Sequence, residues 1–116
     1  MEALGEMKCV ACRSNAPTLT EAEIAELHPQ VSEWEIVEQE GIKQLRRVFR
    51  FDDFAEALTF TNALGEIAEE DGHHPTLLTE WGRTTATWWT HKIKGLHRND
   101  FIMAAKADEL YRRMSV

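Results

Sequence analysis

The sequence contains only two cysteines in 116 residues, and it has no hydrophobic run of the length that crosses a membrane. A membrane-spanning helix needs about 20 apolar residues in succession, so we expect none. Cys9 and Cys12 form one Cys-x-x-Cys pair, whereas a structural zinc site normally takes four Cys or His ligands. The strand-then-helix pattern of a thioredoxin-type redox pair is missing here. We therefore expect a reduced, cytosolic pair, with a metal shared across a dimer or with His28 as the alternative.

Basic side chains are also in short supply, since 13 Lys and Arg stand against 20 Asp and Glu, which gives a formal net charge of −7. Direct binding of nucleic acid requires a basic surface, so the charge argues against it. The first residues combine neither a basic region nor an apolar block, so we expect no signal peptide and a cytoplasmic protein. A hydrophobic content of 43% is ordinary for a globular protein, and the length suits one domain.

The first half of the chain predicts an arm, a short helix and a strand pair. Residues 1–17 lack periodicity and predict an irregular N-terminal arm, with the folded domain covering 18–116. Thr20 and Glu23 match a capping box, so a short helix should begin there and end near Pro29.

Residues 34–38 and 42–51 have strand character around a turn at Glu40-Gly41, which predicts an antiparallel hairpin with one solvent-exposed face. Leu45 and Phe49 fall on the inward face of the second strand, whereas Arg47 interrupts that face. A bulge or a buried partner would each explain Arg47.

The second half predicts a long helix from Asp52 or Asp53 to Asp71, a second hairpin from residues 77–81 and 84–90, and a final helix over 99–113. Two apolar stripes run along the long helix, which predicts that it lies flat on a sheet. Two hairpins without β-α-β alternation indicate an α+β fold. We expect a four-stranded antiparallel sheet with helices packed on one face, in the order α-β-β-α-β-β-α.

Two adjacent histidines stand where the long helix should end and an extended segment should begin. Gly72 can end the helix in a left-handed conformation, and Pro75 cannot continue it. His73 and His74 thus occupy a rigid corner, and their side chains should point in different directions. Histidine titrates near neutral pH, so either could transfer protons there. The simpler alternative is a helix stop followed by two solvated histidines.

Seven residues of the C-terminal half form a more specific pattern than any one of them: Glu69, His73, His74, Pro75, Trp81, His91 and Asp100. Their spacing resembles the signature of the pterin-4a-carbinolamine dehydratases. The segments 49–51, 54–57, 90–91 and 95–96, together with Trp34, also fit the pattern of that family. The resemblance covers roughly residues 18 to 113.

The resemblance implies dehydration of 4a-hydroxytetrahydropterin to quinonoid dihydropterin, which recycles the pterin cofactor of aromatic amino acid hydroxylases. It places the three catalytic histidines at His73, His74 and His91. One proton must reach the departing hydroxyl and another must leave a ring nitrogen, which imidazoles do near neutral pH. This chemistry needs no metal or organic cofactor. We expect His74 and His91 to act as acid and base, with His73 orienting the ring.

The resemblance also makes Glu69, Pro75, Trp81 and Asp100 candidates for binding the substrate. Trp81 could stack on a flat heterocycle or could be a core residue. Asp100 could fix the tautomer of an imidazole or could simply be a carboxylate in the first helical turn. The chain departs from the family at His97, where relatives often have a capping Ser or Thr, and near Leu77, where relatives are often aromatic. These departures affect the helix start and the pocket wall.

Two further functions remain open from the sequence. The first is a non-catalytic role as an accessory of pterin or molybdopterin metabolism or as a protein-interaction module, because mammalian relatives also serve as dimerisation cofactors of a homeodomain transcription factor. The second is a metal site built from histidines 73, 74, 91 and 97, although adjacent histidines that diverge are poor chelators. We expect a small-molecule pterin as the ligand, no membrane partner, and a homodimer or a dimer of dimers.

Overall fold

The computed structural model describes residues 3–6 and 17–114, so Cys9 and Cys12 lie outside the described residues. The elements, in order, are η1 (Leu4–Glu6), α1 (Glu21–Leu27), η2 (His28–Val31), β1 (Glu35–Gln39), β2 (Ile42–Arg50), α2 (Phe54–Asp71), β3 (Thr76–Glu80), β4 (Arg83–Trp88) and α3 (Arg98–Met114). The predicted α-β-β-α-β-β-α order is confirmed, with two 3₁₀ turns added. None of the described helices is both long and apolar enough to span a membrane.

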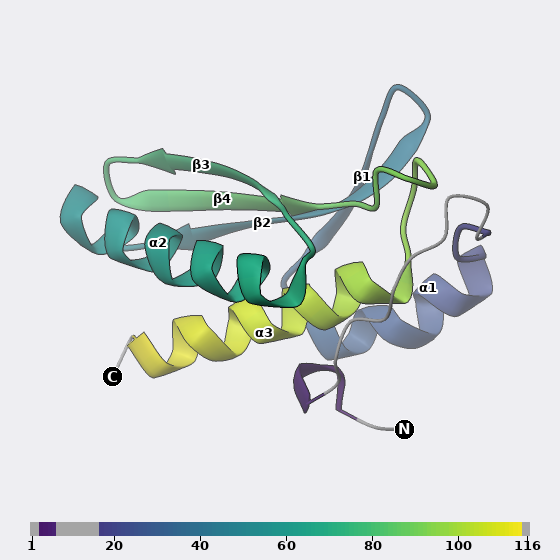
Figure 1. Ribbon diagram of the computed structural model, residues 1–116, viewed down its shortest axis with the longest axis horizontal. Helices are drawn as coiled ribbons and strands as arrows, with labels where there is room; N and C mark the ends of the chain where they lie inside the picture. The colour runs from purple at the N-terminus through teal and green to yellow at the C-terminus, as the bar shows by residue number, and fades with distance from the viewer. Residues whose placement is uncertain (1–2, 7–16, 115–116) are drawn as a thin grey trace.

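The four strands form one antiparallel sheet in the order β1-β2-β4-β3. The helices lie on one face of this sheet, and α2 and α3 run beneath it side by side (Figure 1). The other face carries no helix in the described part of the chain (Figure 1). This is the α+β arrangement that the two hairpins predict.

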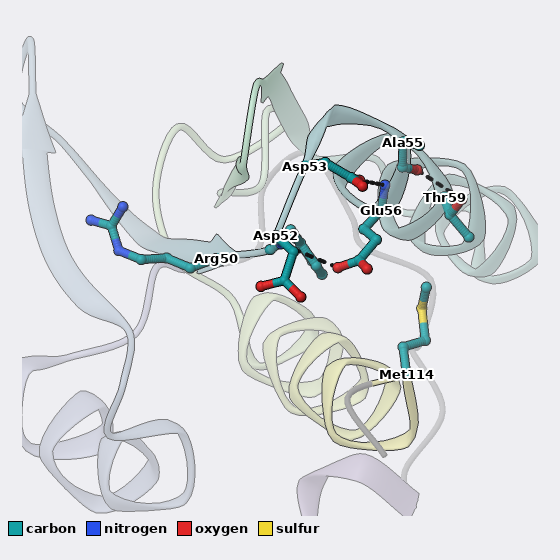
Figure 2. A pocket seen from close by; sticks show the side chains of 8 residues that line it. Arg50, Asp52, Asp53, Ala55, Glu56, Thr59 and Met114 are labelled. Atoms are coloured by element: carbon teal, nitrogen blue, oxygen red, sulfur yellow. Dashed lines mark hydrogen bonds between the residues drawn. The ribbon is translucent and has the colours of Figure 1, made fainter.

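The caps of α1 and α2 follow from their sequences. Thr20 Oγ1 accepts a hydrogen bond from the Glu23 N–H at 3.2 Å, and Glu23 Oε1 accepts from the Thr20 N–H at 2.8 Å, which confirms the predicted capping box. At the start of α2, Asp53 Oδ1 accepts from the Glu56 N–H at 2.8 Å (Figure 2). Each cap satisfies backbone donors that have no partner inside the helix.

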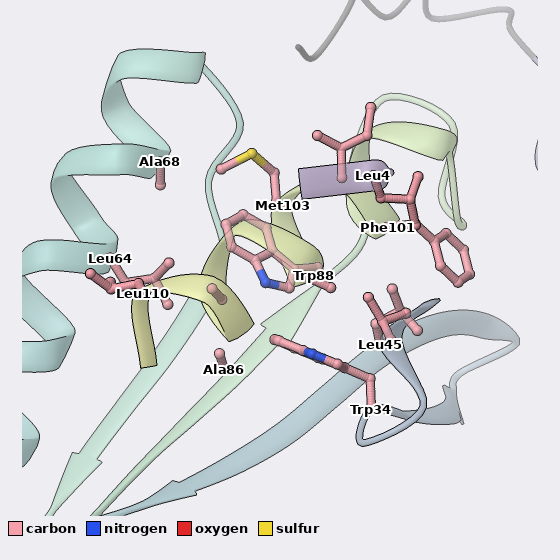
Figure 3. Close-up of a cluster of buried hydrophobic side chains, with 14 of the residues drawn as sticks. Leu4, Trp34, Leu45, Leu64, Ala68, Ala86, Trp88, Phe101, Met103 and Leu110 are labelled. Atoms are coloured by element: carbon pink, nitrogen blue, oxygen red, sulfur yellow. The ribbon is translucent and has the colours of Figure 1, made fainter. Parts of the chain in front are cut away.

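The core lies between the helices and the inner face of the sheet. Its largest fully buried side chains are Trp34, Trp88, Phe49, Phe60 and Phe101. Figure 3 shows the two tryptophans in one cluster of aliphatic side chains that come from the helices and from the strands. Removing such a side chain from water contributes about 1.5–3 kcal/mol. The cluster therefore fixes how α3 packs on the sheet.

Arg47 has a buried partner, which settles the question that its place in β2 raises. Its Nη1 donates to Asp108 Oδ1 of α3 at 2.6 Å, and its guanidinium carbon lies 4.5 Å from the centre of the Phe49 ring. Trp34 Nε1 donates to the same Asp108 oxygen at 2.8 Å. The arginine is thus an inward residue of a regular strand whose charge is paired.

The two apolar stripes of α2 are not buried to the same extent. Ala57, Phe60, Leu64 and Ala68 are buried, whereas Phe54 and Leu58 of the neighbouring stripe are 44% and 41% exposed. Helices cover the sheet from one side only, so a helix in that layer buries one stripe and leaves the next at the surface.

The N-terminal arm also contributes more than its irregular sequence predicts. Leu4 of η1 is 1% exposed and belongs to the core, and its N–H donates to Gln30 Oε1 at 3.0 Å. The turn packs against α3.

Candidate active site

The three predicted catalytic histidines lie at one end of the β3–β4 hairpin. Thr76, the first residue of β3, pairs with Thr87 near the end of β4. The segment before β3 and the segment after β4 therefore leave the sheet at the same end. His73 and His74 belong to the first segment, and His91 belongs to the second.

The corner before β3 has the predicted geometry. Gly72 ends α2 with a φ of 65°, in the left-handed region that favours glycine. The His73 N–H then donates to Ala68 O at 3.1 Å, which closes the last turn of the helix. Pro75 follows and leads into β3, where its ring is half-buried. These local bonds fix where the two imidazoles start.

His73 points inward and is held by Asp100. Its Nε2 lies 2.7 Å from Asp100 Oδ1, and its ring stacks on Trp88 with 5.7 Å between centroids and 8° between planes. Its side chain is 12% exposed and that of Asp100 is 0% exposed. An ionised carboxylate only accepts hydrogen bonds, so Nε2 is the donor and Nδ1 is the basic atom of the neutral ring. Asp100 thereby sets the tautomer of His73.

Asp100 is itself held from the other side. Its Oδ2 accepts from Thr90 Oγ1 at 2.8 Å and from the His97 N–H at 2.9 Å. It is also a first-turn residue of α3, so the two alternatives for this carboxylate both apply. Because Asp100 is fully buried, it cannot meet a ligand directly and acts on the site by holding His73.

His74 points away from His73, as alternation requires. Its Nε2 lies 2.7 Å from Glu69 Oε1, and the two side chains are 62% and 80% exposed. The acidic end of α2 therefore contacts the second histidine of the pair. A contact between side chains this exposed contributes little to stability, and its effect is to orient the imidazole.

His91 stacks on Trp89, with 3.8 Å between ring centroids and 15° between planes. Trp89 lines a depression of ≈ 300 Å³ on the open face of the sheet, together with Gln44, Arg46 and Thr76 among others. Sequence reasoning did not single out Trp89. The signal was available, since an outward-facing tryptophan two residues before a candidate histidine places a flat apolar surface beside it.

Trp81 lies elsewhere in the chain. It occupies the β3–β4 turn, at the other end of the five-residue strand β3 from the histidines. With a rise of about 3.3 Å per residue, the strand alone separates them by roughly 17 Å. Trp81 is 74% exposed, so the core alternative is wrong, and in a single copy of the chain it does not reach the histidines.

A larger cavity of ≈ 550 Å³ lies near the turn that holds Trp81 and is lined by residues of the α2 start and by Met114 (Figure 2). Arg50 on its rim pairs in the sheet with Arg83, at the hairpin end far from the histidines. The carboxylates of Asp53 and Glu56 there accept backbone N–H bonds of the helix start. The histidine cluster and this cavity are thus separate features.

His97 lies beside the His73–Asp100 pair, and the sequence singled it out both as a departure from relatives and as a possible metal ligand. Its Nδ1 accepts from the Asn99 N–H at 3.0 Å, while its own N–H donates to Asp100. Burial lowers the pKa of His97 below its ordinary value of 6.5, the charge of Asp100 raises it, and the charge of His73 lowers it. Among residues 3–6 and 17–114, no three His, Cys, Asp or Glu side chains are grouped to hold a metal ion.

Comparison with known proteins identifies the family of the chain. Residues 17–110 match the family model described as pterin 4 alpha carbinolamine dehydratase. A protein of Nitrosococcus oceani provisionally named a pterin-4-alpha-carbinolamine dehydratase is 62% identical over 112 residues, which cover 97% of this chain and 99% of the relative. A protein of Gloeobacter violaceus with the same provisional name is 60% identical over 107 residues, with 92% of each chain covered.

The crystal structure of a transcriptional coactivator/pterin dehydratase from Brucella melitensis is also similar. It superposes with a TM-score of 0.72 at 30% sequence identity, and the match covers 80% of this chain and 97% of that one. The family model covers most of the domain that holds the histidines. The chain belongs to the pterin 4 alpha carbinolamine dehydratase family.

Proposed function

We propose that this protein dehydrates 4a-hydroxytetrahydropterin to quinonoid dihydropterin and water, and so recycles the pterin cofactor of aromatic amino acid hydroxylases. Membership of the family supports the substrate class. The observation that carries the proposal is that all three histidines lie on the two segments that leave the sheet at the same end of the β3–β4 hairpin, with one of them held by a buried carboxylate at 2.7 Å. Imidazole is the side chain that most often transfers protons in enzymes, and the buried carboxylate gives one of the three a fixed anchor.

The reaction breaks the C4a–O bond of the pterin and forms a double bond from C4a to the neighbouring ring nitrogen. The hydroxyl takes up a proton and leaves as water, and the ring nitrogen loses a proton. The two transfers balance, so the reaction consumes no oxidant or reductant. Two positioned imidazoles, one charged and one neutral, are sufficient for it.

We assign the two transfers to His74 and His91, because both side chains are exposed and can meet a ligand. Glu69 orients His74, and the Trp89 ring beneath His91 gives the flat pterin a surface to lie beside. His73 has its Nε2 held by Asp100 and is mostly buried, which suits orientation of the substrate through Nδ1. Glu69, Pro75 and Asp100 support this site by placing the imidazoles.

The test is turnover of freshly generated 4a-hydroxytetrahydropterin by the protein and by its His74→Ala and His91→Ala variants. Each variant should lose about 10²–10⁴-fold in kcat, the usual contribution of a positioned acid or base. His28→Gln is the matched control, because His28 lies in η2 and its Nε2 contacts the Trp34 carbonyl oxygen at 2.6 Å, a bond that glutamine can keep. The control should retain activity within about twofold.

Two results would contradict the assignment. If both alanine variants keep full activity, His74 and His91 are not the acid and base. If the folded protein does not exceed the uncatalysed rate, the accessory or protein-interaction role becomes the better proposal.

We further propose that the protein forms a homodimer or a dimer of dimers in the cytoplasm. Phe54, Leu58, Leu78 and Trp81 expose large apolar surfaces, between 41% and 74% of each residue. The outer strands β1 and β3 also have unpaired edges in the described chain. Both features are typical of surfaces that pair with another copy.

A further inference from the structure

The start of α3 is capped by a histidine in the position that Ser, Thr, Asp or Asn usually takes. His97 immediately precedes the helix, and its Nδ1 accepts from the Asn99 N–H at 3.0 Å. In return, Asp100 Oδ2 accepts from the His97 N–H at 2.9 Å. The two residues thus form a reciprocal capping box in which an imidazole replaces the hydroxyl.

An imidazole cap differs from a hydroxyl cap because it titrates. The bond from Asn99 requires a lone pair on Nδ1, which only the neutral ring with its proton on Nε2 provides. A proton on Nδ1 removes this bond and places a cation at the N-terminus of a helix, where the macrodipole opposes it. The cap is therefore intact only while His97 is neutral.

The other half of the box belongs to the candidate active site. The Asp100 oxygen that accepts from His97 is the one that Thr90 Oγ1 also contacts, and the second oxygen holds His73 Nε2. Because Asp100 is fully buried, its rotamer depends on these three donors. A change at His97 reaches His73 through one shared carboxylate.

We infer that His97 is a positioning residue for the His73–Asp100 pair and makes that pair sensitive to pH. The neutral imidazole caps α3 and holds Asp100 toward His73. The protonated imidazole loses its bond to Asn99 and competes with His73 for the same carboxylate. The role of the pair in turnover rests on the proposed function, whereas the coupling between the two imidazoles does not.

The charged groups that act on His97 come from two elements. Asp100 of α3 favours the protonated ring, and His73 of the α2–β3 segment disfavours it when charged, while burial disfavours it most. The net direction is a lowered pKa, so the cap should stay intact at neutral pH and open only in more acidic solution. A serine in the same place would cap without this dependence.

The test compares the full-length protein with its His97→Ser and His97→Ala variants by NMR of the imidazole nitrogens from about pH 8 to about pH 5. In the unmodified protein the His97 ring should keep an unprotonated Nδ1 at neutral pH, and the His73 signals should move again as His97 takes up its proton. In His97→Ser the second movement of His73 should disappear. This measurement stands whether or not the protein turns over a pterin.

Turnover gives the second measurement. His97→Ala should lower kcat about tenfold at neutral pH with little change in KM, as the loss of an orienting neighbour does, and His97→Ser should restore it. The acid side of the pH profile should extend to lower pH in His97→Ser than in the unmodified protein. A His73 titration that is the same in the unmodified protein and in His97→Ser overturns the inference, as does an alanine variant whose activity the serine fails to restore.

Discussion

Asp100 illustrates how one buried carboxylate can organise several residues of a site. It has no exposed surface, and its two oxygens contact His73, Thr90 and the backbone of His97. A buried anion without such donors would cost several kcal/mol. The donors therefore satisfy both oxygens of the carboxylate where it contacts His73. His97 stands at the capping-box spacing from Asp100, whereas the spacing of Thr90 and His73 gives no hint that they meet this carboxylate.

Asp108 is the second buried carboxylate, and its environment predicts a pH-dependent stability. Burial raises its pKa above the ordinary value of 3.8, although hydrogen bonds from Trp34 and Arg47 and the charges of Arg47 and Arg112 oppose the rise. Replacing Arg47 by Met removes the cation that is hydrogen-bonded to this carboxylate. We expect a loss of about 3 kcal/mol in the free energy of unfolding at neutral pH, because the buried charge then loses its direct partner.

The sign of the pH effect follows from the direction of that shift. An acid with a raised pKa in the folded state binds its proton there more readily than in the unfolded chain, so its ionisation costs stability as the pH rises. The loss in Arg47→Met should therefore shrink as the pH falls toward the pKa of Asp108. Urea unfolding at two pH values measures this loss of stability. The double variant Arg47→Met/Asp108→Asn should recover much of it. An equal loss at both pH values would contradict the argument.

At the scale of elements, replacing a glycine by alanine should change the stability in opposite directions at two positions, one inside α2 and one at its end. Gly72 has a φ of 65°, whereas Gly65 lies inside the helix, and a Cβ would meet nothing within 4 Å at either position. Gly72→Ala should destabilise the protein by about 1–2 kcal/mol, because a side chain in the left-handed region is strained. Gly65→Ala should stabilise it by about 0.4–1 kcal/mol, because alanine restricts the unfolded chain.

Thermal or urea unfolding of the two variants and of the unmodified protein measures both changes in stability. Gly72→Ala should also disturb the ring signals of His73, which follows it, whereas Gly65→Ala should leave them in place. Two changes of the same sign would show that backbone conformation does not decide the effect at these positions.

The sequence predicts elements well where local bonds decide them. The Thr20–Glu23 capping box, the turn at Gly41 and the helix end at Gly72 each depend on residues a few positions apart. It did not predict that Arg47 meets Asp108, since these residues lie 61 positions apart. The exposure of Phe54 and Leu58 was also missed, because an apolar stripe does not reveal which neighbour covers it.

The candidate site also has features that the sequence predicted and features that it did not. The spacing of seven residues, the three histidines among them, pointed to the family together with the matching segments elsewhere in the chain. Alternation predicted that His73 and His74 diverge. The pairing of Glu69 with His74, the stacking of His91 on Trp89 and the imidazole cap at His97 join residues only two to five positions apart, yet each depends on how the side chains pack against these near neighbours. Side-chain directions at a corner of the chain follow from such packing, which periodicity does not describe.

At the scale of the whole molecule, the exposed apolar side chains predict association of copies. Leu58 lies on the outer side of α2, at 41% exposure, and Trp81 at the tip of the β3–β4 hairpin is 74% exposed. Isolated apolar residues are normal on a surface, but several large ones on neighbouring elements are typical of an interface. We expect a molar mass of two or four chains by light scattering after gel filtration.

Leu58→Glu should shift that mass toward the single chain, with at least about a tenfold weaker association, because a charge would be buried without a partner at the contact. Ala25→Glu adds the same charge at an exposed position of α1 and is the control, with no shift expected. Far-ultraviolet circular dichroism should be alike for both variants, since neither position is buried in the fold. If Leu58→Glu keeps the mass of the unmodified protein, α2 is not at the contact, and the sheet edges β1 and β3 become the surfaces to alter next.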